Sequence, residues 1–490
     1  MKFNYPDDSL ALHTDAYELS MMQTYWKQGV GNRRAVFEAF FRKMPFQNGY
    51  AVYAGLDHII RYVKQLHFTA SDIDYLKSTD QYDDDFLEYL RDFRFTGSIR
   101  SFEEGDLVFN HEPIFQIDAP IIEGQLIETA ILNILNYQIM VATKASRIKS
   151  IVGDQSVMEF GTRRAQELDA SIWGTRAAYI GGFNATSNVR AGKLFGIPIS
   201  GTHAHALVQA YRNDYDAFKA YAQTHRDCVF LVDTFDTLKS GVPTAIRVAK
   251  EFGDKINFIG VRIDSGDLAS LSKRVRTMLN EAGFPDVKIF ASNGLDEKTI
   301  QNLKMQGAKI DVWGIGTKLI TAYDQPTLGA VYKLVAVEDD NGQLVDTIKL
   351  SNNVAKMSTP GKKQVWRIND RLDGKSEGDY ITLADEDPRK EESLNMFNPN
   401  FPLQQKDVSD FIARPMLKDI WKDGEFVYDE PTLDETRDHR TASLDALWDE
   451  YKRDLNPEVY PVDLSQKCYD NKLAMIHHIH EYVKTLGHKE

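Results

Sequence analysis

The chain has 490 residues, of which 42% are hydrophobic and 27% are charged, as in an ordinary folded protein of up to about three domains. Its formal net charge of -14 argues against nonspecific binding to nucleic acid or membranes, and no apolar run approaches the ~18 residues of a membrane-spanning helix. Two cysteines, Cys228 and Cys468, are too few for a disulfide framework and favour a reducing compartment, so we expect a cytoplasmic protein.

The first region, residues 1–130, mixes helical and strand patterns. Its opening segment lacks the apolar stretch of a signal peptide. Residues 50–66 carry apolar side chains at helical spacing and predict an amphipathic helix. Residues 102–120 alternate like short strands that break at Gly105 and Pro113. We therefore predict an N-terminal α+β domain.

Strand and helix patterns alternate regularly in the second region, residues 131–335. The predicted strands are 156–161, 197–201, 229–233, 258–264, 288–292 and 311–316. The predicted helices between them are 164–178, 204–224, 240–252, 267–282 and 296–306. This alternation indicates right-handed βαβ units and a parallel sheet. Because a regular barrel needs eight strands, we predict an irregular, incomplete β/α barrel, with a flat doubly wound sheet as the alternative.

The regular alternation is lost in the third region, residues 336–490. A turn at 338–342 leads into further strands, and a strongly charged segment follows at 385–392. The last helix is predicted near 464–485. We assign this region to a C-terminal subdomain, which completes a prediction of three domains in an α/β protein.

The segment 197–205 places two histidines, His203 and His205, where a predicted strand gives way to a helix. Reactive groups of α/β proteins lie at such positions. One interpretation is a hydrogen-bonded structural pair. Metal ligation is disfavoured, because no histidine between His225 and His439 can supply further ligands from later strand ends. The remaining interpretation is a nucleophilic or acid–base histidine.

Charged side chains also end two later strands. Asp233 and Asp264 could cap the helices that follow them, or could hold Mg²⁺ or a sugar hydroxyl. Arg262 lies two residues before Asp264 and so shares its face of the strand. A guanidinium at that place is costly unless it meets an anion, so we favour a functional role for it.

Two further strand ends suit a phosphorylated or aromatic ligand. Gly314 and Gly316 leave backbone N–H groups unobstructed at a late strand end, where barrels often bind phosphate. Phe160 is followed by Arg163 and Arg164. It belongs either to the core or to a site for a flat anionic aromatic ligand, which would stack on the ring and pair with guanidinium.

Short motifs in a fixed order along nearly the whole chain resemble the nicotinate phosphoribosyltransferase family. They are Thr14–Met21, Phe37–Lys43, Glu159–Arg164, Gly181–Asn184, Gly201–His205, Val261–Asp267, Ser292–Gly294, Gly314–Thr317 and Pro360–Val365. The resemblance implies a type II phosphoribosyltransferase that makes nicotinate mononucleotide and pyrophosphate from nicotinate and phosphoribosyl pyrophosphate. It further implies a role in NAD biosynthesis, ATP hydrolysis as a coupled reaction, a Mg²⁺ requirement and a homodimer with shared active sites.

The resemblance also implies roles for individual residues. His205 would be the phosphorylated histidine, and Asp233, Arg262 and Asp264 would be catalytic, with the two carboxylates as candidate Mg²⁺ ligands. Phe160 and the partner subunit's Tyr17 would sandwich the pyridine. The other implied substrate contacts are Arg163, Thr202, Ser265, Gly266, Asn293, Gly294, Gly314, Gly316 and Thr317. The implied pyrophosphate or ATP contacts are Arg42, Lys362 and Lys363.

Three alternatives remain open at this point. They are the sibling nicotinamide phosphoribosyltransferase, a metal-dependent barrel hydrolase and a ligand-binding protein without catalysis. The loop 181–188 contains no acidic residue, and Arg163 and Arg164 lie at a neighbouring strand end. This charge pattern favours the carboxylate of nicotinate over the amide of nicotinamide.

Overall fold

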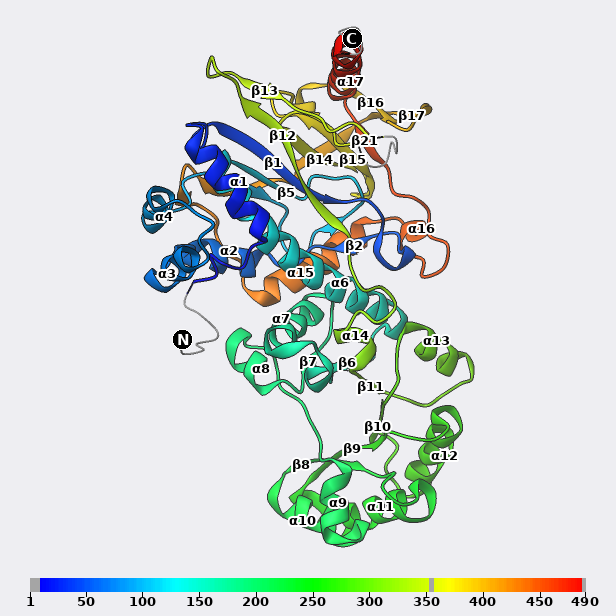
Figure 1. Cartoon of the computed structure of the whole chain (residues 1–490). Coiled ribbons are helices and arrows are strands. Elements are labelled where there is room, and N and C mark those ends of the chain that lie inside the picture. The colour runs from blue at the N-terminus through cyan, green and yellow to red at the C-terminus, as the bar shows by residue number, and fades with distance from the viewer. Residues whose placement is uncertain (1–8, 352–356, 487–490) are drawn as a thin grey trace. The chain divides into compact units, whose positions relative to one another are not determined.

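The computed structural model describes residues 9–351 and 357–486, which form two compact units (Figure 1). Unit 1 comprises Met1–Met140 and Thr327–Glu490, and unit 2 comprises Val141–Pro326. The structure thus groups the regions predicted as separate domains, 1–130 and 336–490, in one unit. Part of the opening segment considered for a signal peptide, residues 1–8, lies outside the described residues. No helix within the described ranges is long and apolar enough to span a bilayer.

A seven-stranded sheet joins the two ends of the chain in unit 1. Its interior strand β1 (Arg34–Phe41) pairs antiparallel with β12 (Ala330–Glu338) on one side and with β5 (Phe115–Pro120) on the other. The remaining strands are β3 (Ser98–Ser101), β13 (Leu344–Asp346), β19 (Lys418–Lys422) and β20 (Glu425–Phe426), in the order β13-β12-β1-β5-β3-β19-β20. This pairing is the physical reason why the N- and C-terminal regions form one unit.

Helices of the N-terminal region complete this part of unit 1. They are α1 (Ala16–Lys27), α2 (Leu56–Gln65), α3 (Ala70–Ser78), α4 (Asp84–Arg91), α5 (Ile121–Leu126) and the first part of α6 (Glu128–Val152). The helix predicted over 50–66 begins only at Leu56. The residues before it form β2 (Ala51–Val52), and Gly55, at φ +117°, turns the chain into the helix.

The C-terminal region of unit 1 adds a second sheet, in the order β18-β14-β15-β21. Its strands are β14 (Lys363–Asp370), β15 (Ser376–Leu383), β18 (Phe411–Pro415) and β21 (Val462–Leu464). Two small pairings are β2 with β4 (Leu107–Val108) and the hairpin of β16 (Ser393–Asn398) with β17 (Phe401–Ser409). The helices are α15 (Leu433–Ala446), α16 (Asp449–Lys452) and α17 (Gln466–Leu486), the red helix in Figure 1. A core that includes Trp366, Ile368 and Met396 packs in this region.

Unit 2 is built on a curled sheet of six parallel strands, in the order β7-β6-β11-β10-β9-β8. The strands are β6 (Ser156–Glu159), β7 (Ala185–Thr186), β8 (Asp227–Leu231), β9 (Asn257–Ile263), β10 (Lys288–Ser292) and β11 (Val312–Ile315). The main helices are α7 (Glu167–Ile180), α8 (Val189–Phe195), α9 (His205–Tyr211), α10 (Asp214–Thr224), α11 (Val242–Phe252), α12 (Leu268–Glu281), α13 (Glu297–Met305) and α14 (Thr317–Ile320). The predicted irregular, incomplete β/α barrel is confirmed.

Two predicted elements of unit 2 differ from the structure. The segment 197–201 is not a strand, because Ile199 makes only an isolated bridge to Thr186, and the sixth strand is the short β7 instead. Pro198 has no N–H to donate to a ladder, which explains why this apolar run does not extend the sheet. The single helix predicted over 204–224 is divided into α9 and α10 at Arg212, whose φ is +64°.

A buried charged network holds β14 and β15 together in unit 1. Arg367 donates two hydrogen bonds to the carboxylate of Asp379, at 2.9 and 2.7 Å, and Tyr460 donates a third at 3.0 Å. Glu112 faces the same carboxylate, and one of its own oxygens is buried without a donor. Burial, followed by repulsion from Asp379, raises the pKa of Glu112 well above its ordinary value. We infer that Glu112 is protonated and donates to Asp379.

Replacing Glu112 by Gln keeps a donor toward Asp379 but removes the titration. A carboxyl whose pKa is raised by folding stabilises the fold below its unfolded pKa of 4.5 and loses that contribution as the pH rises toward the folded pKa. We expect Glu112→Gln to match the wild type near that pH and to become the more stable protein above it, by up to about 1.4 kcal/mol per pH unit. Urea denaturation from pH 4.5 to pH 8 measures this difference, with exposed Glu88→Gln as the control. Parallel pH profiles of the wild type and Glu112→Gln would contradict the inference.

Candidate functional site

The predicted polar residues of unit 2 gather at the carboxyl ends of its parallel strands. Phe160 follows β6, Asp233 lies just beyond β8, Asp264 follows β9 and Ser292 ends β10. Strands β8, β9 and β10 are hydrogen-bonded neighbours, and β11 lies between β10 and β6. Because the carboxyl ends of parallel strands meet at one edge, the sheet brings these groups to a common site.

Hydrogen bonds across neighbouring strand ends fix the two carboxylates. Asp233 Oδ2 accepts the backbone N–H of Asp264 at 2.9 Å and the hydroxyl of Ser265 at 2.6 Å. Asp264 Oδ1 accepts the hydroxyl of Ser292 at 2.5 Å, and Asn293 donates its side-chain amide to the Asp264 carbonyl at 3.0 Å. The second oxygen of Asp233 is buried and has no donor among the described residues. It is therefore available to a ligand.

The sequence left helix capping as the ordinary role of Asp233 and Asp264. In the structure, other aspartates cap these helical segments. Asp236 accepts the N–H groups of Leu238 and Lys239, and Asp267 accepts the N–H of Ser270 at the start of α12. The capping interpretation is therefore excluded for Asp233 and Asp264, and their carboxylates remain for the site.

The two histidines of the Gly-Thr-His-Ala-His motif have different environments. His203 is buried, and its Nε2 accepts the backbone N–H of Leu231 at 3.2 Å. Its ring packs against Phe218, Tyr221 and Phe230. Burial lowers the pKa of His203 to about 4, so the ring is neutral at physiological pH. His203 is a structural histidine.

His205 faces the carboxylates instead. It begins α9, and 39% of its side chain is exposed. Its Nδ1 lies 3.0 Å from the Thr234 hydroxyl, and its Nε2 lies 3.9 Å from Asp264 Oδ2. One ring nitrogen is thus hydrogen-bonded, while the other points toward Asp264 across a distance too long for a direct hydrogen bond.

Arg262 supplies a positive charge that is only partly neutralised. One of its terminal nitrogens donates to the His203 carbonyl at 3.1 Å, but its buried Nε has no acceptor. Burial lowers the pKa of Arg262, the charges of Asp264 and Asp233 raise it, and Arg163 lowers it again. The guanidinium nevertheless stays protonated. An incoming anion would satisfy the unused N–H and offset the repulsion from Arg163.

Packing against Phe160 explains why glycine is needed at two of the positions predicted to bind phosphate. A Cβ on Gly314 would lie 2.6 Å from a carbon of the Phe160 ring, and one on Gly316 would lie 2.7 Å from the Phe160 carbonyl oxygen. Both glycines therefore allow Phe160 to lie against the end of β11. Gly294 is different, because its φ of +66° is left-handed and the space around it is open. It remains the better candidate for a backbone approach to phosphate.

The remaining predicted contacts of unit 2 lie at the same strand ends. Thr202 is half-buried and donates its hydroxyl to the His203 carbonyl at 3.2 Å. Gly266 has a φ of +80° in the turn before α12, and Thr317 is the exposed first residue of α14. Arg163 is exposed in a short 3₁₀ turn, Thr162–Arg164. All four segments border the carboxyl edge of the sheet.

Glu159 is a residue of the site that sequence reasoning did not assign. Its carboxylate is buried at the end of β6, where it accepts hydrogen bonds from Thr175 at 3.0 Å, from Thr186 at 2.6 Å and from the backbone of Gly161. Burial raises its pKa. It ties α7 and β7 to the turn that carries Phe160. The sequence signal was a single acidic residue at the end of an apolar strand.

Lys363 and Lys362 were predicted to contact pyrophosphate or ATP, and both have partners within unit 1. Lys363 is buried, and its Nζ lies 2.8 Å from a carboxylate oxygen of Glu38 and 2.6 Å from the Gly361 carbonyl. Lys362 pairs with Asp118 at 2.6 Å. The contacts of Lys363 give it a structural role, whereas Lys362 is still partly exposed.

Two other predicted contacts of unit 1 are more available. Arg42 follows β1, and its buried Nε has no acceptor among the described residues. Tyr17 lies on α1 with 49% of its surface exposed.

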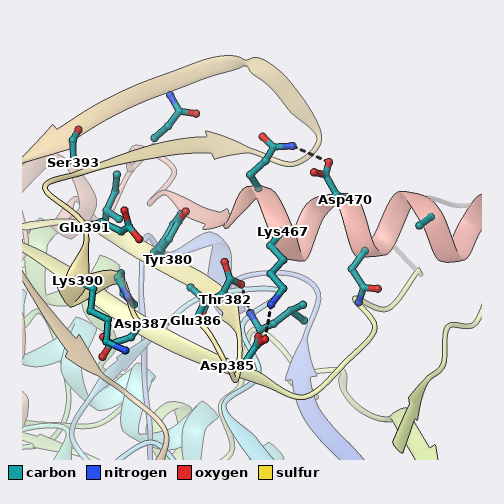
Figure 2. A pocket seen from close by; sticks show the side chains of 17 residues that line it. Tyr380, Thr382, Asp385, Glu386, Asp387, Lys390, Glu391, Ser393, Lys467 and Asp470 are labelled. Atoms are coloured by element: carbon teal, nitrogen blue, oxygen red, sulfur yellow. Dashed lines mark hydrogen bonds and ion pairs between the residues drawn. The ribbon is translucent and has the colours of Figure 1, made fainter.

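An acidic cavity in unit 1 contains none of the predicted site residues. Figure 2 shows this space of about 1040 Å³ between the segment 385–395 and α17. Some of its polar and charged groups already bind one another, since Lys467 pairs with Asp385 at 2.5 Å and Gln466 donates to Asp470 at 2.8 Å. We therefore do not regard it as the functional site.

Known proteins match this chain along most of its length. A family model described as the nicotinate phosphoribosyltransferase (NAPRTase) family matches residues 155–390, and models of its N-terminal and C-terminal domains match residues 12–136 and 362–472. Nicotinate phosphoribosyltransferase of Bacillus subtilis is 58% identical over 479 residues, which cover 98% of each chain. That of Caenorhabditis elegans is 35% identical over 527 residues, covering 94% of this chain and 93% of the relative. The solved structure of human nicotinic acid phosphoribosyltransferase matches with a TM-score of 0.84 at 29% identity, covering 94% of this chain and 99% of that one.

The contact between Gly314 and Phe160 yields a stability prediction. Gly314→Ala places a methyl group 2.6 Å from the ring, so we expect a loss of about 1–3 kcal/mol from overpacking. Gly201→Ala is the matched control, because a Cβ there meets nothing within 4 Å, and we expect it to stay within about 0.5 kcal/mol of the wild type. Urea denaturation measures both variants. In a double-mutant cycle, Phe160→Leu should relieve part of the Gly314→Ala cost, and strict additivity would show that the ring does not set this constraint.

Proposed function

Because the chain belongs to the nicotinate phosphoribosyltransferase family, whose enzymes act in NAD biosynthesis, we propose that the strand-end site of unit 2 transfers a phosphoribosyl group to nicotinate. The donor is phosphoribosyl pyrophosphate, and the products are nicotinate mononucleotide and pyrophosphate. ATP hydrolysis is coupled to this transfer through phosphorylation of His205. The observation that carries the proposal is the convergence of two carboxylates, an unsatisfied guanidinium and an exposed histidine at one edge of the sheet.

These residue types suit the transfer reaction. The bond from C1 of the ribose to pyrophosphate breaks, and the pyridine nitrogen forms the new bond to C1. Positive charge therefore develops on the ribose while negative charge develops on the leaving group. Asp233 and Asp264 can orient the ribose hydroxyls and stabilise the first charge, and Arg262 can stabilise the second. No protein nucleophile is required, so positioning and electrostatics supply the rate.

The carboxylates also fit the Mg²⁺ that the family resemblance implies. Asp233 keeps a buried oxygen without a donor, and Asp264 lies beside it. Within residues 9–351 and 357–486, no group of three or more His, Cys, Asp or Glu side chains is arranged to hold a metal ion. A Mg²⁺ ion would therefore rest on these two carboxylates, water and substrate oxygens, as is common for this ion, and would neutralise pyrophosphate charge.

Phe160 and Arg163 suit nicotinate as the acceptor. The Phe160 ring is fixed against the end of β11 and offers a face on which a pyridine can stack. Arg163 is exposed, and it lies close enough to Arg262 to lower the pKa of that guanidinium. A carboxylate between the two guanidiniums is therefore favoured over a neutral amide. Nicotinamide is the runner-up substrate.

The two histidine environments support His205 as the phosphorylated residue. His203 is buried and hydrogen-bonded on its Nε2, so ATP has no access to it. His205 is partly exposed and lies beside the carboxylates proposed to hold Mg²⁺. A phosphoryl group on His205 would add negative charge next to that ion and could shift the binding of pyrophosphate between states.

We also propose that the enzyme is a homodimer in which the partner subunit's Tyr17 covers the second face of the pyridine. One ring from Phe160 leaves the other face of the substrate in water, and a two-fold interface would supply an aromatic face to both sites. Unit 2 exposes large apolar side chains that such an interface would cover, among them Leu168, Val189, Leu194 and Ile199. The two free, buried cysteines fit the cytoplasm as the compartment.

Product analysis tests the proposed function directly. With phosphoribosyl pyrophosphate and Mg²⁺, we expect nicotinate to yield its mononucleotide, ATP to stimulate the yield, and nicotinamide to have a kcat/KM lower by at least about tenfold. His205→Ala should lose ATP hydrolysis and ATP stimulation but keep some ATP-independent synthesis, whereas His225→Ala serves as an exposed control in the same unit. Equal use of the two pyridines would favour nicotinamide phosphoribosyltransferase. Undiminished acid-labile phosphate on His205→Ala would exclude His205 as the phosphorylated residue.

Complementation tests the shared site. Tyr17→Ala and His205→Ala should each lack ATP-stimulated synthesis, and mixing them under subunit exchange should restore part of it. In a mixed dimer, one site receives an intact His205 from one chain and an intact Tyr17 from the other. Demonstrated exchange without recovery, or a fully active monomer in sedimentation, would show that each chain forms its site alone.

A further inference from the structure

A second large cavity, of about 1170 Å³, lies within unit 1 and is built from that unit alone. Its walls come from β1, the turn 110–113, the start of β14, β15, the β16–β17 hairpin, the segment 458–464 and α17. The volume is slightly above the range of about 300–1,000 Å³ that is usual for cavities that hold small organic ligands. Free phosphate alone would fill only a small part of it.

Lys472 on α17 presents a cation to this cavity without an acidic partner. The one hydrogen bond described for its Nζ is a long one, 3.4 Å to the Thr359 hydroxyl, and no described carboxylate lies within ion-pair distance. The other two lysines in the lining are neutralised, Lys363 by Glu38 at 2.8 Å and Lys406 by Glu377 at 2.7 Å. Burial, with a further contribution from Lys363, lowers the pKa of Lys472.

His111 is a second basic group near Lys472, and Arg42 lies near His111. His111 lines the cavity in a left-handed backbone conformation, φ +70°, and its N–H donates to the Phe41 carbonyl at 2.8 Å. Burial lowers the pKa of His111, and the charges of Lys472 and Arg42 lower it further. Arg42 has a buried Nε without an acceptor. The positive charges of Lys472 and Arg42 thus both act on His111 in a partly desolvated place, and an anion there would offset the cost of burying them.

The acidic lining residues do not neutralise this basic group. Glu38 is already paired with Lys363. Burial raises the pKa of Asp463 to about 6, and the positive charge that opposes this shift is Lys406 rather than Lys472. Glu458, the remaining acid of the lining, has no described ion pair. The end of the cavity at His111 and Lys472 therefore favours negative charge.

The rest of the lining suits a flat, partly apolar body. Phe40 and Ile381 contribute buried apolar surface, and Phe401 exposes 69% of its surface at the hairpin. Asn398 and Gln404 add side-chain amides that can donate to and accept from the edge of a heteroaromatic ring. An aromatic face beside amides and basic groups is a combination found in sites for nucleotides.

We propose that this cavity is a binding site for a nucleoside phosphate, with the phosphate held by His111 and Lys472 and the base lying toward Phe401. The proposal goes beyond the transferase reaction, because His111, Lys472 and Phe401 are not among the residues implied or proposed for binding its substrates or ATP.

Calorimetry separates this site from the one in unit 2. The double variant Arg163→Ala/Arg262→Ala serves as the background, because it removes the guanidiniums of the strand-end site. AMP, pyrophosphate and adenosine are titrated separately into this protein. We expect about one AMP per chain, weaker binding of pyrophosphate and little of adenosine, because the phosphate and the base contribute together. AMP should also raise the melting temperature.

Lys472→Met in this background should weaken AMP binding by at least about tenfold and abolish the AMP-dependent rise in melting temperature, because it removes a charge-assisted contact. Lys467→Met is the matched control on the same helix, since Lys467 pairs with Asp385 at another cavity. His111→Gln is a second variant in case Lys472→Met fails to fold. Unchanged AMP affinity in both variants, no AMP binding in the background, or equal binding of pyrophosphate and AMP would overturn the proposal.

Discussion

The carboxylate of Asp233 is held by the backbone of the neighbouring strand end, and the geometry of the site in unit 2 depends on this bond. It exists because β8 and β9 run parallel in a register that places Leu231 opposite Arg262. The next pairing, Ala291 with Ile263, brings Ser292 to Asp264 in the same way. A shift of one residue between these strands would turn the carboxylates toward the opposite face. The register of the sheet therefore sets the distances on which the chemistry relies.

Buried charges in this protein fall into two groups with different consequences. Arg367 and Lys363 have all or most of their donors satisfied by carboxylates and carbonyls, and they hold sheets and loops together. Arg262 and Arg42 each keep a buried N–H without an acceptor. Since an unsatisfied buried donor costs free energy, its persistence is better explained by a ligand than by the fold. Sequence position alone does not separate the two groups.

Local patterns predicted most of unit 2, because its strands and helices are close in sequence and are bounded by turn residues. The strand 288–292 was located to the residue, and the site aspartates were found because they follow such strands. The run 197–201 was wrongly assigned as a strand. Its apolar character suggested a strand, but Pro198 has no N–H to donate to the hydrogen bonds of a sheet. The pairing of β1 with β12 and the burial of Lys363 by Glu38 were not predictable, because periodicity does not identify a partner that is distant in sequence.

The pairing of β1 with β12 has a consequence for how the chain folds during synthesis. Unit 2 is one continuous segment, whereas unit 1 is interrupted by it and needs strands from both sides to complete its central sheet. Contacts between strands that are near in sequence close small loops and form early. The pairing of β1 with β12 closes a much longer loop and can form only after β12 has been synthesised. A nascent chain in which β12 has not yet been synthesised would expose an edge of β1. Unit 2 can therefore fold before the seven-stranded sheet, whose strands come from the segments before and after it in the sequence.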